Sequence, residues 1–246
     1  MVSRLRPNRI DRPGTGQEAW DSWSALRHLP AVDPLAWPSV VVVAAHPDDE
    51  VLGAGGTMAM LAAAGARLRL IALTDGEASH PGEDPEVIAR TRVAESAAAL
   101  GVLGATSAEL IRLRLPDTGL AAREDELAGL LREQCAGFGV CLAPWEADAH
   151  ADHEAAGRAA RRAAQGTNRA VLSYPIWMWH WARPADPRVP WHRACQIPLP
   201  SEVAARKRSA IGAFASQLTG RAAGAGPVLP AGVVAHFTRP REVLLR

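Results

Sequence analysis

The stretch that decides the fold is Ser39-Val40-Val41-Val42-Val43-Ala44-Ala45-His46-Pro47-Asp48-Asp49-Glu50, within a chain of 246 residues. Its first seven residues form a nearly continuous β-branched run, which is typical of a strand buried on both faces in a parallel sheet. One imidazole and several carboxylates follow at once. The tip of a buried sheet does not tolerate such a cluster without a metal ion or strong pairing. We therefore expect a functional site at the end of this strand.

Helices and strands are expected to alternate along the next 130 residues or so. The patterns predict helices over 54–65, 85–100, 122–135 and 152–165, and strands over 68–73, 108–113, 138–143 and 169–174. This alternation predicts an α/β fold, a Rossmann-like, mostly parallel sheet with helices on both faces. Ligands bind such sheets at the carboxyl ends of the strands, so we expect the site there.

A second polar group follows the strand expected over 138–143. It is Asp148-Ala149-His150-Ala151-Asp152-His153-Glu154, and it leads into the helix expected over 152–165. The two histidines are three residues apart, so they lie on one side of a helical turn and can face the same sheet edge. Helix capping is an alternative role for Asp48 or Asp49 alone. Capping alone does not explain why a cluster of polar residues follows each of two strands.

Together the two groups fit an open zinc site with one zinc ion per chain. Two histidines and one carboxylate bind zinc and leave coordination positions for water and substrate. Zinc lowers the pKa of its bound water to about 7 and polarises a carbonyl group. A spare carboxylate can act as general base, and a spare imidazole can stabilise the oxyanion or protonate the leaving amine. The residues therefore favour metal-assisted hydrolysis.

At these motifs the chain resembles the LmbE-like, or PIG-L-like, zinc N-deacetylases. The first family motif is similar to residues 45–50, and the second to His150-Ala151-Asp152-His153, in which Ala151 replaces a common proline. Further family features occur in the same order at residues 74–77, 92–101 and 115–117. The resemblance covers about residues 39–160 and thins out after about residue 175, where the family itself varies.

The resemblance assigns roles to individual residues. It implies that the zinc ligands are His46, Asp49 and His153. It also implies that Asp48 is the general base and that His150 stabilises the tetrahedral intermediate.

The resemblance also implies supporting residues and a substrate class. Asp152 would orient His150 or the ligands, and Arg92 and Asp117 would hold sugar hydroxyls. The reaction would remove an N-acetyl or N-acyl group from a small amino-sugar-type molecule or glycoside, through a metal-activated water. We therefore expect a metal-dependent N-deacetylase.

Two other functions stay open. His46-Pro47-Asp48 with a distant histidine also fits the two-histidine, one-carboxylate triad of non-haem Fe(II) enzymes, in which Asp48 would be a ligand. Those enzymes are usually all-β barrels, and metal analysis with a test for O₂ consumption would separate the two hypotheses. A non-catalytic sugar-binding module with a structural cation would bind sugar without turnover.

Tryptophans gather beyond residue 175, where Trp177, Trp179, Trp181 and Trp191 lie within 15 residues. Their alternation at 177, 179 and 181 would place three rings on one face of an extended segment, as in a core strand. In the other interpretation, Trp179 and Trp181 line the cleft and bind the substrate, because flat apolar rings suit a sugar or a hydrophobic group. Further on, a helix is expected over 200–217 and one or two strands over 228–245.

Composition narrows the remaining choices. Lys and Arg number 27 against 26 Asp and Glu, so no excess positive charge favours nucleic acid. No apolar run reaches the roughly 18 residues of a membrane span. The N-terminal segment lacks the apolar core of a secretory signal, so a cytoplasmic location is expected. The three scattered cysteines argue against a Cys-based zinc site.

The whole chain, residues 1–246, is interpreted as a single domain. Residues 1–16 contain little to bury and are expected to form a loose arm. Residues 175–246 are expected to be the variable C-terminal part that lines the cleft. The high content of Arg and Ala is typical of a bacterial protein, and self-association is left open.

Overall fold

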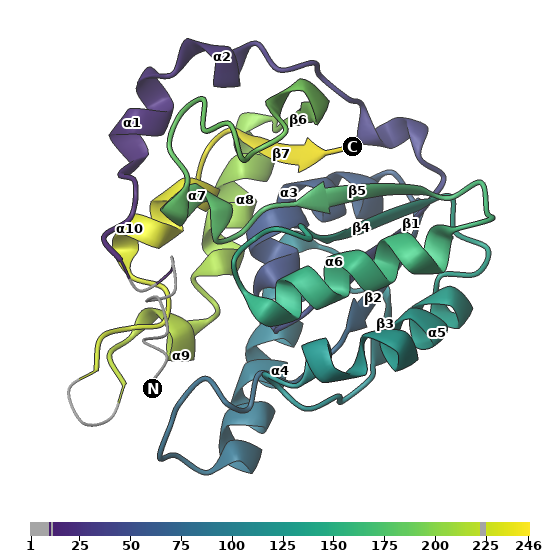
Figure 1. The fold of residues 1–246 in the computed structure, drawn as a ribbon, viewed down its shortest axis with the longest axis vertical. Coiled ribbons are helices and arrows are strands. Elements are labelled where there is room, and N and C mark those ends of the chain that lie inside the picture. Colours follow the sequence, from purple (N-terminus) through teal and green to yellow (C-terminus); the bar gives the residue numbers. More distant parts are fainter. Residues whose placement is uncertain (1–9, 11, 222–224) are drawn as a thin grey trace, which may run out of the picture.

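The computed structural model describes residue 10, residues 12–221 and residues 225–246 (Figure 1). Its centre is a seven-stranded sheet in the order β3-β2-β1-β4-β5-β7-β6. The strands are β1 (Ser39–Ala44), β2 (Arg67–Ala72), β3 (Glu109–Arg112), β4 (Val140–Pro144), β5 (Ala170–Tyr174), β6 (Ala194–Pro198) and β7 (Arg241–Leu245). Strands β1 to β5 are parallel, whereas β7 is antiparallel to both β5 and β6. The predicted mostly parallel α/β sheet is confirmed.

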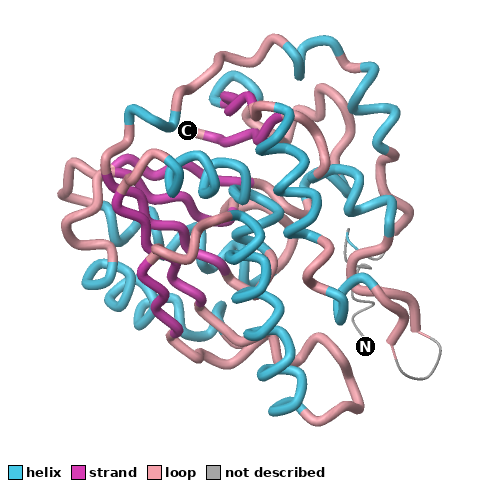
Figure 2. The backbone as a smooth tube through the Cα atoms, turned by 180° about the vertical axis from the view of Figure 1, so that it is seen from behind, coloured by secondary structure: helices cyan, strands magenta, loops and turns pink. Residues whose placement is uncertain are grey.

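Helices cover both faces of this sheet (Figures 1 and 2). The longer ones are α3 (Asp49–Ala63), α4 (Pro85–Leu103), α5 (Glu124–Gln134), α6 (Ala151–Ala164) and α8 (Ser201–Ile211). The valines of β1 alternate between two apolar cores. Val40 and Val42 pack in the core that includes residues of α3, α4 and α8, and Val41 and Val43 in the core that includes α5 and α6. A strand buried on both faces therefore accounts for the unbroken apolar run.

The order of the strands reverses at β1, which pairs with β2 on one side and β4 on the other. In open α/β sheets, ligands bind outside the carboxyl ends of the strands at such a switch point. Both polar groups of the sequence follow these strands, one after β1 and the other after β4. The fold therefore brings them to the position where a ligand is expected.

The shorter helices precede β1 or follow β5 in the chain. They are α1 (Gln17–Ser22), α2 (Ser24–Arg27), α7 (Met178–Trp181), α9 (Ala215–Leu218) and α10 (Ala231–Val234). The segment from 177 to 181 is thus not extended, and the expected alternation of three tryptophans on one face is wrong. Strand β6 lies between Trp191 and the helix predicted over 200–217, where the sequence pattern predicts no strand. Among the described residues, none of the helices has both the length and the apolar character needed to cross a membrane.

Most of the expected N-terminal arm, residues 1–9 and 11, lies outside the described residues. The described end of the arm is attached to the region after β5. Thr15 N–H donates to the carbonyl of His180 at 2.8 Å, and Thr15 Oγ1 donates to the carbonyl of Ala182 at 2.5 Å. The end of the arm that contains Thr15 therefore belongs to the folded structure.

Candidate metal centre

The first polar group forms the turn from β1 into α3. The N–H groups of Val51 and Leu52 donate to the Asp48 carbonyl at 2.9 and 2.8 Å and so begin the helix. Asp48 has a φ of 126°, which few residues other than glycine adopt without strain. The His46 N–H donates to Asp49 Oδ2 at 2.9 Å. A strained turn thus holds the side chains of His46 and Asp49 close together.

The second polar group begins helix α6. His150 is the N-cap residue, and its Nδ1 accepts a hydrogen bond from the Asp152 N–H at 3.3 Å. His153 follows in the first turn, where its side chain is almost fully buried. Because β1 and β4 are neighbours, the two polar groups meet at one edge of the sheet, as the sequence predicts.

The side chains of three residues of this cluster, His46, Asp49 and His153, form a compact triangle. His153 Nε2 lies 3.3 Å from His46 Nδ1 and 3.3 Å from Asp49 Oδ1. His46 Nδ1 lies 3.6 Å from Asp49 Oδ2. Ligands that bind a tetrahedral zinc ion at about 2.0–2.1 Å are themselves about 3.3–3.4 Å apart. Two imidazoles and one carboxylate at these separations fit a zinc ion and leave a fourth position open.

Both histidines of the triangle have their outer nitrogen against a carboxylate. His153 Nδ1 lies 2.8 Å from Asp148 Oδ2. His46 Nε2 lies 3.2 Å from Asp117 Oδ1 and 3.3 Å from Asp152 Oδ2. Metal-binding histidines typically donate their second N–H in this way, which fixes the tautomer and the ring orientation. The inner nitrogens then keep their lone pairs for a cation.

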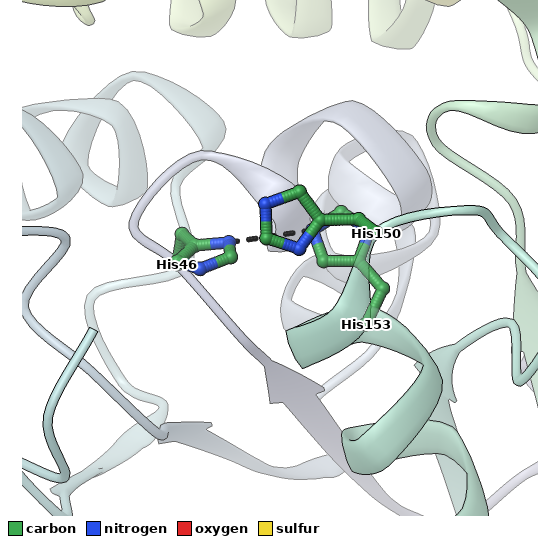
Figure 3. Close-up of side chains that lie close together, drawn as sticks. All are labelled: His46, His150 and His153. Carbon is green, nitrogen blue, oxygen red and sulfur yellow. Dashed lines mark hydrogen bonds between the residues drawn. The ribbon is translucent and has the colours of Figure 1, made fainter. Parts of the chain in front are cut away.

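A second ligand set replaces the carboxylate by a third imidazole. His46, His150 and His153 offer nitrogens within 4.8 Å of one another, and their rings converge in Figure 3. The ring centres of His150 and His153 are 4.6 Å apart, and those of His46 and His150 are 4.9 Å apart. In the triangle with Asp49, the ligand atoms have separations close to those of tetrahedral zinc, so we take it as the candidate site. His150 is then free for another role beside the metal.

A third set would join His46 to Asp117 and Asp152. This set uses His46 Nε2, whereas the triangle with Asp49 uses His46 Nδ1. One imidazole would therefore have to bind two metal ions if both sets were occupied. The carboxylate of Asp152 is already occupied by backbone groups, because the N–H groups of Thr118 and Leu120 donate to it at 2.8 and 3.1 Å. These carboxylates therefore act as acceptors that orient His46.

Electrostatics at the triangle favour a cation. Burial lowers the pKa of His46 and His153, but the surrounding carboxylates outweigh burial and raise the pKa of both imidazoles. For Asp49, burial raises the pKa, but the two histidines outweigh it and bring the pKa well below its usual range. The cluster therefore attracts positive charge, and a metal ion can supply that charge in place of protons.

Asp48 points to a different partner. Its Oδ2 lies 3.1 Å from Arg92 Nη2, which also donates to the Pro47 carbonyl at 2.6 Å. Burial raises the pKa of the Asp48 carboxyl to about 7, and the Arg92 guanidinium opposes this rise. The Fe(II) alternative needs Asp48 as a ligand, but the Asp48 carboxylate is paired with the Arg92 guanidinium. That pairing and the α/β fold both count against the alternative.

A pocket of ≈ 210 Å³ opens onto this cluster. Its polar wall includes Asp48, Arg92, Asp117 and His150. Its apolar wall comes partly from the C-terminal part of the chain, with Ile176, Trp177, Val228 and Leu229. The pocket therefore joins the metal triangle to residues on both sides of position 175, in agreement with the expected cleft-lining role of that region.

The tryptophans expected to bind substrate lie elsewhere. Trp179 is 4% exposed, its ring centre lies 5.0 Å from that of Trp20, and its carbonyl accepts the Trp20 Nε1–H at 2.9 Å. Trp181 stacks on Trp145 at 6.2 Å and donates through Nε1 to the Asp148 carbonyl at 3.0 Å. Trp177, just before α7, lines the pocket instead. The interpretation of Trp179 and Trp181 as cleft residues is corrected, because the helical turn α7 directs them into packing contacts.

Asp148 is a candidate supporting residue that the sequence motifs do not single out. Its buried carboxylate accepts the N–H groups of Ile176, Trp177 and Met178 at 2.9–3.0 Å, besides facing His153. It thereby links a proposed metal ligand to the pocket wall. An acidic residue two positions before His150 was visible in the sequence, but the partners that give it this role come from a distant segment.

Comparison with known proteins identifies related chains. A model of the family described as PIG-L: GlcNAc-PI de-N-acetylase matches residues 41–164, about half of the chain. A relative from Catenulispora acidiphila, named 1D-myo-inositol 2-acetamido-2-deoxy-alpha-D-glucopyranoside deacetylase 2, is 33% identical over 162 residues, or 54% of this chain and 53% of that protein. Across the curated relatives, the matched segments span between 20% and 53% of the relative's length.

Solved structures extend the likeness over more of the chain. A conserved protein of Thermus thermophilus is 31% identical, with a TM-score of 0.58 over 80% of this chain and 84% of that one. The N,N'-diacetylchitobiose deacetylase of Pyrococcus horikoshii shares the fold, with a TM-score of 0.58 at 20% identity over 85% and 82% of the two chains. The motifs, the fold and these matches together show that the chain belongs to the PIG-L (GlcNAc-PI de-N-acetylase) family.

Proposed function

We propose that the protein is a zinc-dependent amidohydrolase that removes an N-acetyl or N-acyl group from an amino-sugar substrate. The observation that carries the proposal is the combination of groups in one pocket. A triangle of metal-ligand atoms lies beside a carboxylate, Asp48, and an imidazole, His150, that the triangle does not use. A purely structural cation site or a sugar-binding module needs neither spare group.

We propose His46, Asp49 and His153 as the ligands of the metal ion. When bound there, zinc supplies Lewis-acid polarisation of the amide carbonyl and lowers the pKa of a bound water to about 7. The carboxylates of Asp117, Asp152 and Asp148 support this assignment, because they face the outer nitrogens of the two histidines. We expect one zinc ion per chain.

Asp48 is proposed to accept a proton from the attacking water. Arg92 holds the carboxylate in place by its contacts with Asp48 Oδ2 and the Pro47 carbonyl. A general base must lie in hydrogen-bond reach of the proton that it removes, and Asp48 lines the pocket next to the ligand Asp49.

His150 is proposed to stabilise the negative charge that develops on the substrate oxygen. Its Nδ1 accepts the Asp152 N–H, so the proton of the neutral ring is on Nε2. An N–H donor beside developing negative charge is the requirement for oxyanion stabilisation. Asp152 holds His150 through its N–H and His46 through its carboxylate, so we propose it as a positioning residue.

The substrate class is inferred from the pocket and the relatives together. Arg92 and Asp117 line the polar wall, which supports their proposed contacts with sugar hydroxyls. The Catenulispora acidiphila relative is named as a deacetylase of an acetylated glucosamine joined to inositol. We therefore propose an N-acetylglucosaminide, whose second group lies against the apolar wall formed by Trp177 and Leu229.

A substrate panel tests the proposal. Purified protein is stripped with a chelator, reloaded with zinc, and assayed for amine release from N-acetylglucosamine, its inositol glycoside, diacetylchitobiose and N-acetylated amino acids. We expect release from amino sugars by the zinc-loaded protein, and none by the stripped protein. Sugar binding without amine release in the loaded protein would favour the non-catalytic alternative.

A further inference from the structure

A second, much smaller cavity of ≈ 20 Å³ lies beside helix α3, apart from the pocket at the metal centre. Leu52 lines both spaces, so this part of α3 separates them. Four basic side chains line the small cavity together with apolar residues such as Leu52 and Trp179. The basic residues are Lys207, His236, Arg239 and Arg241, with Glu242 as the one acidic residue.

Glu242 is fully engaged with other groups. Its carboxylate accepts the N–H groups of Gly56 and Thr57 at 2.7 and 2.9 Å, and it pairs with Lys207 Nζ at 2.6 Å. Lys207 also donates to the Leu52 carbonyl at 2.8 Å. The one acidic residue of the cavity is therefore satisfied by α3 and Lys207, and the charge of Lys207 is matched.

Arg239 lacks such a match. It is 8% exposed, and its guanidinium carbon lies 3.9 Å from the centre of the Trp179 ring. Its Nε and Nη2 have no hydrogen-bond partner among residues 12–221 and 225–246. Burial lowers the pKa of Arg239 to about 9, so the side chain stays charged at neutral pH. A buried charge without a partner is strongly unfavourable, and proteins pair such groups.

The other polar groups of the cavity do not supply the missing charge. Arg241 Nη1 donates to the side-chain oxygen of Gln196 at 3.1 Å, and His236 Nδ1 contacts Gln17 Oε1 at 2.8 Å. These partners are neutral. The cavity thus combines two guanidinium groups without an ion pair among the described residues, Arg239 and Arg241, with several N–H donors and a free volume.

We propose that this cavity binds one small inorganic anion of halide size, with chloride as the occupant. A cavity needs roughly 10–15 Å³ of probe-occupied volume to hold one water molecule. The volume of ≈ 20 Å³ therefore has room for one small ion. The anion neutralises Arg239 and fixes the packing of β7 and α8 against α3. This inference is independent of the proposed catalytic activity.

The test uses the thermal stability of the wild-type protein in sodium chloride, sodium bromide and sodium gluconate at equal ionic strength. At a tenfold excess of anion over Kd, binding should raise Tm by roughly 3–6 °C relative to gluconate. Arg239→Gln should lose this halide-specific increment. Arg188→Gln is the matched control, since Arg188 also stacks on a tryptophan, 4.7 Å from the Trp181 ring, but is half exposed and paired with Asp186.

A crystal of the wild-type protein soaked in bromide tests the position of the ion without any substitution. An anomalous peak beside Arg239 is expected. A peak consistent only with water, or no halide-specific Tm increment in the wild type, would overturn the proposal. The same increment in Arg239→Gln as in the wild type would also overturn it. If Arg239→Gln does not fold, Arg239→Lys keeps the charge and should keep a reduced increment.

Discussion

The parallel half of the sheet, residues 39–174, and the C-terminal layer, residues 175–246, contribute differently to the same pocket. The parallel half supplies the candidate metal ligands, the proposed base and the proposed oxyanion donor, all on turns that follow β1 and β4. The C-terminal layer supplies apolar walls, and the carboxylate of Asp148 joins the two regions. This comparison supports the proposal that the first region supplies the catalytic groups and the sugar contacts of Arg92 and Asp117, and that the second region contacts the group attached to the sugar.

The largest effect is expected when a proposed metal ligand is removed from the parallel half. His153→Ala should lose the bound metal and at least roughly 10³-fold in kcat/KM, because a metal-ion Lewis acid is worth several kcal/mol. Metal content by elemental analysis and amine release would be measured on the same preparation. His192→Ala, an exposed histidine in the C-terminal layer, is the control and should keep both. Full metal occupancy in His153→Ala would contradict the ligand assignment.

A second substitution separates catalysis from metal binding within the parallel half. His150→Ala should keep about one metal ion per chain and lose roughly 10²–10³ in kcat, as for a lost oxyanion donor. The loss should appear in kcat more than in KM, because the contact forms in the transition state. If His150→Ala loses its metal instead, the three-histidine ligand set would replace the one with Asp49.

The connection between the regions is tested at Asp148. Asp148→Asn keeps the shape of the side chain but weakens its interaction with His153 Nδ1. Metal affinity should fall by roughly 10–100-fold, the usual range for a partner that orients a ligand. Competition with a metal indicator measures this directly. Unchanged affinity would mean that Asp148 serves only the backbone of residues 176–178.

The smallest kinetic effect is expected in the C-terminal layer, and it sharpens the division between the regions. Trp177→Ala should lower kcat/KM for N-acetylglucosaminides with an attached group by about 10-fold more than for free N-acetylglucosamine, because a well-packed ring is worth about 1–2 kcal/mol. Trp179→Ala is the matched comparison. Its ring is in the core, so this variant should lose about 3–5 kcal/mol of unfolding free energy and show no preference between the substrates. Equal losses for both substrates in Trp177→Ala would remove Trp177 from recognition.

The same division explains how far the sequence could predict the structure. In the parallel half, each strand is a local apolar run, and each metal-ligand candidate follows such a run directly. The two polar groups could therefore be placed at one edge of the sheet from the sequence, since neighbouring parallel strands end at one edge. The choice of His46, Asp49 and His153 as ligands came from the family resemblance. The role of Asp117 beside His46 follows only from the folded geometry, whereas the family resemblance already implied that Asp152 orients His150 or the ligands.

The C-terminal layer depends on contacts between distant residues. Strand β6 is five residues long and exists through its pairing with β7, so its own sequence carries a weak signal. The packing of Trp179 depends on Trp20, which is 159 positions away. Local alternation suggested an extended segment, whereas α7 turns the chain. Trp177 therefore lines the pocket, whereas Trp179 packs in the core.

The most direct test of the central claim compares Asp48→Asn with Asp49→Asn in metal content and amine release. The two residues are adjacent and receive the same substitution. Any difference between the two variants in metal content or turnover therefore reflects the different roles of the two carboxylates. Asp48→Asn is expected to keep about one zinc per chain and to lose at least ~10²-fold in turnover, as for a lost general base. Asp49→Asn is expected to lose the zinc together with the activity. Loss of zinc in Asp48→Asn with full zinc in Asp49→Asn would contradict the account.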